Sequence, residues 1–216
     1  MPVSARVLPD FELPIANPWI DHRSGPTRQL SDYAQAKLVV VCFLSLEGEP
    51  VRRAEAALRA CVGRYVRQGV RFVAINAFDV AVNAKQCFKS MEENATRRVY
   101  PFPYLFDAQQ TVAQACSVEV VPDVLVANAD RHILYQGRID GSCLDANVPS
   151  NAVELCQALD DLLETGRVLR PVQAAHGIPM RWLPEAGPLR ARTDRTGRAS
   201  LADRRAAIAR PSADEQ

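Results

Sequence analysis

Six cysteines are the residues of this chain that are most able to do chemistry, and they are Cys42, Cys61, Cys87, Cys116, Cys143 and Cys156. A local dithiol or a zinc site usually has two cysteines with two to four residues between them. No two cysteines of this chain have that spacing. The sequence therefore predicts neither kind of site, and in a reducing compartment most of these residues are expected to be small apolar residues of a core.

Cys87 and Cys143 are the two cysteines that we expect to be exposed. Cys87 lies in a polar segment, VNAKQCFKSMEENATR, and Cys143 lies in a loop, GSCLDAN. An accessible thiol with a lowered pKa can act as a nucleophile without a second cysteine. These two positions are therefore the candidates for a single reactive cysteine, and inert surface thiols are the simpler interpretation.

Other common chemistries have no pattern in this sequence. His22, His132 and His176 are scattered, with no metal-ligand spacing. There is no G-x-x-x-x-G-K-[ST] loop, no G-x-G-x-x-G fingerprint and no G-x-S-x-G elbow. We therefore expect no metal and no cofactor.

Composition is that of an ordinary globular protein. The 216 residues are 48% apolar and 24% charged, and their formal net charge is +1. Such a balance gives no overall field that would attract nucleic acid or anionic lipid. The opening MPVSARVLPDFELP lacks the apolar run of a signal peptide, and no stretch approaches membrane-spanning length. We therefore expect a cytoplasmic protein that binds neither nucleic acid nor membrane.

The pattern of apolar residues in the first half of the chain predicts a β-α-β unit. Residues 37–44, KLVVVCFL, form a continuous apolar run that is typical of a strand buried on both faces. Residues 49–69 carry apolar side chains at helical spacing, including Cys61, with Pro50 in the first turn and Gly69 at the C-terminal cap. Residues 70–76, VRFVAIN, predict a second buried strand.

The second half adds a helix over residues 82–97, a short strand in YPFPYLFD and a brief helix in QQTVAQAC. The strings VPDVLVAN and HILYQGRI predict a hairpin, and residues 151–164 predict a closing helix that ends at Gly166. This order predicts an α/β fold with a mixed central sheet and helices on both faces. We place the domain at residues 1–167. Residues 168–216 are expected to be a Pro- and Arg-rich C-terminal extension that is partly flexible.

Several strings of the chain resemble one family. They are PDFELP, LVVVCFL, GVRFVAIN, YPFPYLFD, VPDVLVANADRHILYQGRID and GIPMRWLP, and together they span about residues 8–184. The chain thus resembles the thioredoxin-like redoxins of the alkyl hydroperoxide reductase/thiol-specific antioxidant (AhpC/TSA) family. The resemblance implies a thioredoxin-like fold and a thiol-dependent peroxidase or disulfide oxidoreductase activity.

The cysteines that the resemblance implies are absent from their positions. In the family the first buried strand leads into a C-x-x-C-P motif, where a helix N-terminus stabilises the thiolate. Here the string is LSLEGEP, with Leu46 and Glu49 at the two cysteine positions before Pro50. The family's late G-C-x-I-K-W motif is Gly177-Ile178-Pro179-Met180-Arg181-Trp182, so Ile178 stands where a third cysteine would. The chain is predicted to be redox-degenerate.

Two further residues complete the former active-site groove, which consists of Leu46, Glu49, Pro50, Val121 and Pro122. By the resemblance, Val121-Pro122 is the cis-proline loop that presents backbone to extended substrates. Glu49 fits a carboxylate that faces the positive end of a helix dipole, or a general base in the cleft. The same dipole should lower its pKa, which argues against a base at neutral pH.

We therefore predict a thioredoxin-fold module whose groove binds a protein or peptide without exchanging disulfides. The alternative is an antioxidant peroxidase or disulfide oxidoreductase that uses Cys87 or Cys143, although no P-x-x-x-T-x-x-C pattern surrounds either residue. A third possibility is an assembly subunit that docks through the Arg-rich stretch of residues 189–216.

Overall fold

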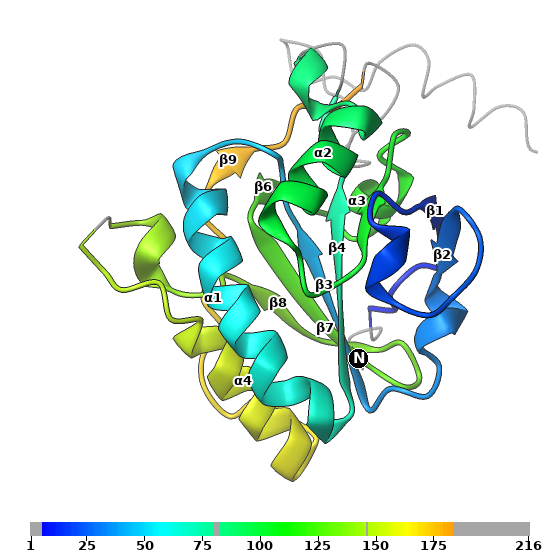
Figure 1. Ribbon diagram of the computed structural model, residues 1–216. Coiled ribbons are helices and arrows are strands. Elements are labelled where there is room, and N and C mark those ends of the chain that lie inside the picture. Colours follow the sequence, from blue (N-terminus) through cyan, green and yellow to red (C-terminus); the bar gives the residue numbers. More distant parts are fainter. Residues whose placement is uncertain (1–5, 80–82, 146, 184–216) are drawn as a thin grey trace, which may run out of the picture.

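A five-stranded mixed sheet forms the centre of the computed structural model, which describes residues 6–79, 83–145 and 147–183 (Figure 1). In spatial order the strands are β5 (Tyr104–Phe106), β4 (Val70–Asn76), β3 (Leu38–Phe43), β7 (Asp123–Asn128) and β8 (Ile133–Gly137). The pairs β3/β4 and β4/β5 are parallel, whereas β3/β7 and β7/β8 are antiparallel. The predicted mixed sheet and hairpin are confirmed.

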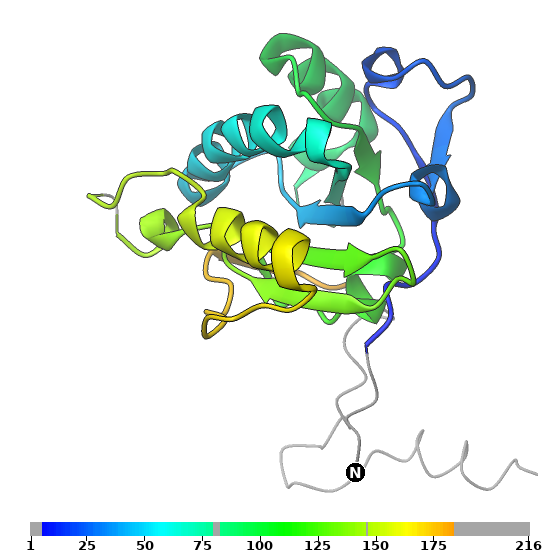
Figure 2. The same ribbon diagram turned by 90° about the horizontal axis from the view of Figure 1, so that it is seen from below.

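Helices cover both faces of this sheet (Figures 1 and 2). One face packs against α1 (Glu49–Tyr65), α2 (Phe88–Arg98) and α4 (Val153–Thr165). The other face packs against the N-terminal segment, a 3-10 turn (Leu30–Tyr33) and α3 (Thr111–Ala115). Side chains of β3 alternate between the two clusters, so every residue of this strand is buried. This double burial explains the continuous apolar run in the sequence.

An N-terminal hairpin lies beside this core. Its strands β1 (Glu12–Pro14) and β2 (Thr27–Gln29) pair antiparallel. Arg28 is 1% exposed, and its guanidinium donates to the Asp21 carboxylate at 2.6 Å. The buried charge is therefore paired, as the cost of burying an isolated ion requires.

Helix α1 forms as predicted. It follows Gly48, whose φ of +113° suits a residue without a Cβ, and Pro50 lies in its first turn. A 3-10 turn (Val66–Gln68) and Gly69, with φ +91°, end the helical segment. Cys61 is 1% exposed on the apolar face of α1, so its predicted packing position is confirmed.

The second helix begins later than predicted. The sequence predicted a helix over residues 82–97, but α2 starts at Phe88 after a 3-10 turn (Ala84–Gln86). The Asn83 side chain accepts a hydrogen bond from the Lys85 N–H at 3.0 Å, a local bond that competes with helix formation. Cys87 therefore lies at the N-cap of α2 and not within it.

The chain continues to pack against the domain after α4 ends at Gly166. Strand β9 (Ile178–Pro179) pairs antiparallel with β6 (Val120–Val121), and Met180 is buried in the core. The Gln110 side chain bonds the backbone of residues 181 and 183 at 2.8 and 2.7 Å. The prediction of an extension from residue 168 did not anticipate this pairing, in which Ile178, Met180 and Trp182 also pack their side chains against the core. Residues 184–216, including the Arg-rich stretch, lie outside the described residues.

Candidate functional site

The loop between β3 and α1 forms one wall of the candidate site. Leu46 is 6% exposed, and its N–H donates to the side-chain oxygen of Gln86 at 2.9 Å. The Ser45 hydroxyl donates to the Glu47 carbonyl at 2.8 Å. The first of the two predicted cysteine positions is thus occupied by a buried packing residue in a loop fixed by hydrogen bonds.

Glu49 is the first residue of α1, and its side chain is 56% exposed. Its carboxylate accepts hydrogen bonds from Arg52 at 2.6 Å and from Arg53 at 3.0 Å. These hydrogen bonds, and the positive charges behind them, lower the pKa of Glu49. The pKa of Glu49 is therefore lowered, as expected, but the main cause is the two arginines and not the helix dipole. An ionised, paired carboxylate of this kind is a weak general base at neutral pH.

The peptide bond between Val121 and Pro122 is cis, as expected from the resemblance. However, the backbone of Val121 already has a partner, because Val121 pairs with Ile178 of β9. Figure 1 shows β6 and β9 side by side near the start of α1. The strand edge beside the cis-proline is therefore occupied by the protein's own chain.

Two glycines permit this close approach. A Cβ on Gly177 would lie 2.2 Å from the carbonyl oxygen of Val121. A Cβ on Gly48 would lie 2.2 Å from Cδ1 of Ile178, so the Ile178 side chain fills the space beside Gly48. Gly48 lies between Leu46 and Glu49 in the chain. The structure thus brings together the three positions at which the resemblance expects cysteines.

Cys143 lies close to the start of α1, which the sequence did not indicate. Its 3-10 turn (Gly141–Cys143) packs on α1, and its sulfur is 3.8 Å from the Pro50 carbonyl oxygen. Burial, with a smaller effect from the Asp140 carboxylate, raises the pKa of Cys143 to about 11. This thiol is therefore protonated at neutral pH and a poor nucleophile.

Cys87 has the opposite electrostatic environment. It is half-buried at the N-cap of α2, with its sulfur 3.3 Å from the Ser90 hydroxyl. Hydrogen bonds from the Ser90 side chain and backbone lower the pKa of Cys87. The side-chain oxygen of the neighbouring residue Gln86 accepts a hydrogen bond from the Leu46 N–H, so Cys87 lies near the former active-site groove. Of the two candidate cysteines, Cys87 is the better nucleophile.

A polar cleft of about 550 Å³ opens next to Leu46, between the start of α1 and α2. Its lining residues include four cations and two carboxylates; they are Leu46, Glu47, Arg52, Lys85, Ser90, Glu93, Asn94, Arg97 and Arg98. Lys85 lies 3.6 Å from Glu47, and Arg52 is held by Glu49. Arg98 is paired with Glu55, which is not among the lining residues. Three of the four cations therefore have a carboxylate partner, and the fourth, Arg97, donates to the side-chain oxygen of Asn94.

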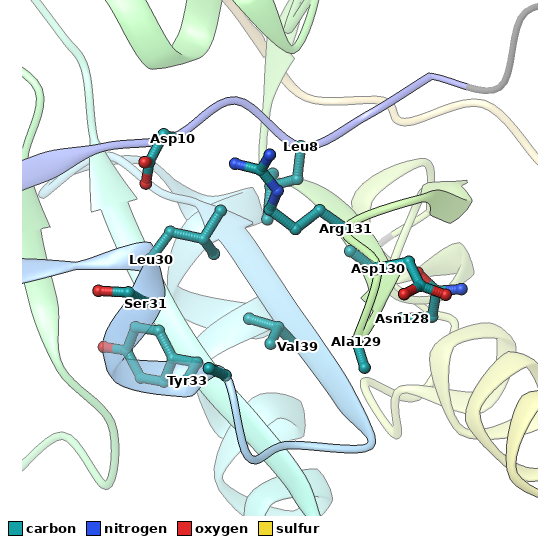
Figure 3. Close-up of a pocket in the computed structure, with 12 residues that line it drawn as sticks. Leu8, Asp10, Leu30, Ser31, Tyr33, Val39, Asn128, Ala129, Asp130 and Arg131 are labelled. Carbon is teal, nitrogen blue, oxygen red and sulfur yellow. The ribbon is translucent and has the colours of Figure 1, made fainter.

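A second, more apolar pocket of about 280 Å³ lies at the other end of the sheet (Figure 3). Its lining includes Leu8, Leu30, Tyr33, Val39 and Arg131. Val39 belongs to the beginning of β3, whereas the candidate site follows the end of that strand. This pocket is therefore separate from the cis-proline and the α1 N-terminus.

Asp123 is a titratable residue that the sequence reasoning missed. It directly follows Pro122, is 3% exposed and accepts a hydrogen bond from the Gln136 side chain at 2.8 Å. Burial raises the pKa of Asp123 to about 6. A single carboxylate inside the apolar string VPDVLVAN was the signal that could have identified it.

Within residues 6–79, 83–145 and 147–183, no three His, Cys, Asp or Glu side chains gather in a way that could hold a metal ion. No helix in the same ranges has the length and apolarity needed to cross a bilayer.

Comparisons with known proteins support one family. The model of the AhpC/TSA family matches residues 5–136 of this chain, a range that ends before β9. A hypothetical protein from Sinorhizobium meliloti is 25% identical, with a TM-score of 0.75, and the match covers 85% of this chain and 97% of that protein. An uncharacterized conserved protein from Geobacillus kaustophilus is 30% identical, with the same TM-score of 0.75 and coverages of 86% and 95%.

More distant structures share the fold. A peroxidoxin, BcpB, from Mycobacterium tuberculosis is 21% identical, with a TM-score of 0.51 over 76% of this chain and 96% of that protein. A search of curated proteins found no match. The predicted thioredoxin-like fold is confirmed by these neighbours and by the sheet described above.

Gly177→Ala should destabilise the fold, because the added methyl group would clash with the backbone of Val121. We expect the free energy of unfolding to fall by about 1 to 3 kcal/mol, measured by denaturant unfolding. Gly63→Ala is the matched control, since a Cβ there meets nothing within 4 Å on α1. The control should be neutral or stabilising by up to about 1 kcal/mol. Equal effects of the two changes would contradict the close packing of β9.

Asp123→Asn should change how the stability of the protein depends on pH, because it removes a buried carboxyl group. The folded pKa of about 6 lies above the reference value of 3.8, so ionisation of Asp123 costs stability as pH rises through this window. Asparagine does not ionise, so the variant does not pay this cost. The free energy of unfolding of the variant minus that of the wild type should therefore increase by up to about 3 kcal/mol between about pH 4 and about pH 7. Denaturant unfolding at each pH measures this difference. A constant difference across the window would show that Asp123 does not titrate there.

Proposed function

The chain belongs to the AhpC/TSA family, and we propose that it is a redoxin without thiol chemistry at the family site, which acts by binding a polypeptide segment. The observation that carries this proposal is the composition of that site. Leu46, Glu49 and Ile178 occupy the positions where the resemblance expects cysteines. None of these side chains can form a disulfide, and Cys143, whose sulfur lies 3.8 Å from the Pro50 carbonyl oxygen, has a raised pKa.

The occupied strand edge supports a binding mode that differs from that of a disulfide reductase. A thioredoxin-like enzyme offers backbone beside its cis-proline to an extended substrate, as in strand addition generally. Here β9 takes that place on β6. A partner that approaches the site therefore contacts the surface next to it and not the cis-proline edge.

The cleft between α1 and α2 is the surface that best fits such a partner. It is open, lies beside Leu46 and carries Arg52, Lys85, Arg97 and Arg98 against Glu47 and Glu93. Within the described residues Arg97 bonds an amide oxygen and not a carboxylate, and a guanidinium can bind a carboxylate with two hydrogen bonds. We therefore propose a partner segment rich in Asp and Glu.

A second candidate function is favoured by one observation, the lowered pKa of Cys87 at the N-cap of α2. In this case Cys87 would act as a single nucleophile toward peroxide or a disulfide. The raised pKa of Cys143 argues against the same role for that residue. The enzymatic alternative therefore depends on Cys87.

The wild-type chain should not accelerate the reduction of insulin by dithiothreitol. The reason is that the helix start that activates a thiolate in a thioredoxin-like site carries a glutamate here. The double variant Leu46→Cys/Glu49→Cys restores the C-x-x-C spacing and serves as the gain-of-function control, with a thiol of lowered pKa at position 49. Wild-type turnover above background would contradict the proposal. If that turnover disappeared in Cys87→Ser but remained in Cys143→Ser, the result would support Cys87 as a single catalytic nucleophile in place of the proposed binding function.

Peptides that differ only in net charge test the proposed partner. Acidic peptides should bind the full chain in fluorescence anisotropy, and Lys85→Glu/Arg97→Glu should weaken that binding by about tenfold or more, because favourable charge contacts become repulsive. The matched control is Arg67→Glu, a charge reversal at an exposed residue of the turn after α1. Binding that ignores peptide charge, or that falls equally in the control, would reject the cleft as the binding surface.

A further inference from the structure

Two cysteines that are distant in sequence face each other between α1 and α4. Figures 1 and 2 show these helices side by side on one face of the sheet. The sulfur of Cys61 on α1 lies 3.7 Å from the sulfur of Cys156 on α4, across 95 residues of sequence. A disulfide needs about 2.0 Å between sulfurs, so the two atoms are in contact and must approach by about 1.7 Å to bond.

Neighbouring contacts hold the two helices in this alignment. One turn after Cys61, the Tyr65 hydroxyl lies 3.0 Å from the Cys156 carbonyl oxygen and 2.7 Å from the Asp160 carboxylate. Arg64 donates to the same carboxylate at 2.9 Å. The cysteine pair therefore lies within a polar network that fixes α1 against α4.

The two thiols differ in access. Cys61 is 1% exposed, whereas Cys156 is half-buried and reachable from solvent. A hydrogen bond from the Cys61 thiol, with smaller contributions from Tyr65 and Arg64, lowers the pKa of Cys156. The same hydrogen bond and burial raise the pKa of Cys61. Cys156 is thus the more exposed of the two thiols and the one with the lowered pKa, and Cys61 is the buried thiol beside it.

We propose that Cys61 and Cys156 form a reversible disulfide that joins α1 to α4, with hydrogen peroxide as the oxidant and a small dithiol as the reductant. The Cys156 thiolate attacks one oxygen of hydrogen peroxide, and the product is a sulfenic acid and hydroxide, which takes up a proton to become water. The Cys61 sulfur then displaces the second oxygen as water. Overall, two thiols and one hydrogen peroxide give one disulfide and two waters.

This pair is separate from the family site. Cys61 lies in the fourth turn of α1, 12 residues after Glu49, and neither cysteine lines the cleft beside Leu46. The proposal does not depend on the proposed binding function. A chain without disulfide reductase activity can still respond to peroxide through this pair, with α1 and α4 covalently joined in the oxidised form.

Thiol counting and peptide mapping of the full chain test this directly. After treatment with a small excess of hydrogen peroxide, the chain should retain four of its six thiols and lose the mass of two hydrogens. Trypsin releases Cys61 in the peptide of residues 60–64, and this should be linked to the peptide of residues 139–167. That second peptide contains both Cys143 and Cys156, so fragment ions assign the bond. Dithiothreitol should restore all six thiols.

Variants provide the matched controls. Cys143→Ser should still lose two thiols and give the same linked peptides, whereas Cys61→Ser and Cys156→Ser should lose the linkage. The mapping of the wild-type chain decides the question even if a core variant fails to fold. Six free thiols after treatment, a bond at another cysteine, or irreversible oxidation of Cys156 without a bond to Cys61 would each overturn the proposal.

Discussion

The contact of Ile178 with the loop before α1 ties together the parts of the candidate site. Its side chain fills the space that the absent Cβ of Gly48 leaves, and its backbone pairs with Val121 beside the cis-proline. Gly177 makes that pairing possible, because a Cβ there would meet the Val121 carbonyl. One short segment therefore closes the strand edge and fills the space beside Gly48, the residue before α1. In a site built this way, an isoleucine occupies the place where the resemblance expects a sulfur.

The electrostatics around the loop are consistent with this arrangement. Glu49 at the helix start is paired with Arg52 and Arg53, which hold its pKa low and remove it as a base. Burial raises the pKa of Cys143, although its sulfur lies near Pro50. What remains open is a cleft with more positive than negative side chains. The described residues thus form a cleft lined by charged side chains beside the place where the resemblance expects a nucleophile.

The fold followed from the sequence because each long element has a strong local pattern. The run KLVVVCFL is buried on both faces of the sheet, and the apolar stripe of α1 faces the core. Local patterns did not separate β9 from the rest of the extension, because the strand is only two residues long and the alternating apolar residues Ile178, Met180 and Trp182 are too few to be decisive. Nor could they show that Cys61 meets Cys156, since both residues only mark apolar faces of separate helices. The start of α2 was misplaced because the bond between Asn83 and Lys85 favours a turn, and the position of Cys87 changed with it.

The central claim is that the protein's own chain fills the family site, and hydrogen exchange tests it most directly. The Met180 N–H donates to the Glu119 carbonyl at 2.9 Å, so its hydrogen exchange shows whether β9 is paired with β6. Its exchange should be slowed to a level comparable with amides of the central sheet, because opening it requires β9 to leave β6. Exchange at the rate of an unstructured peptide would contradict the account, since the cis-proline edge would then be open to a substrate.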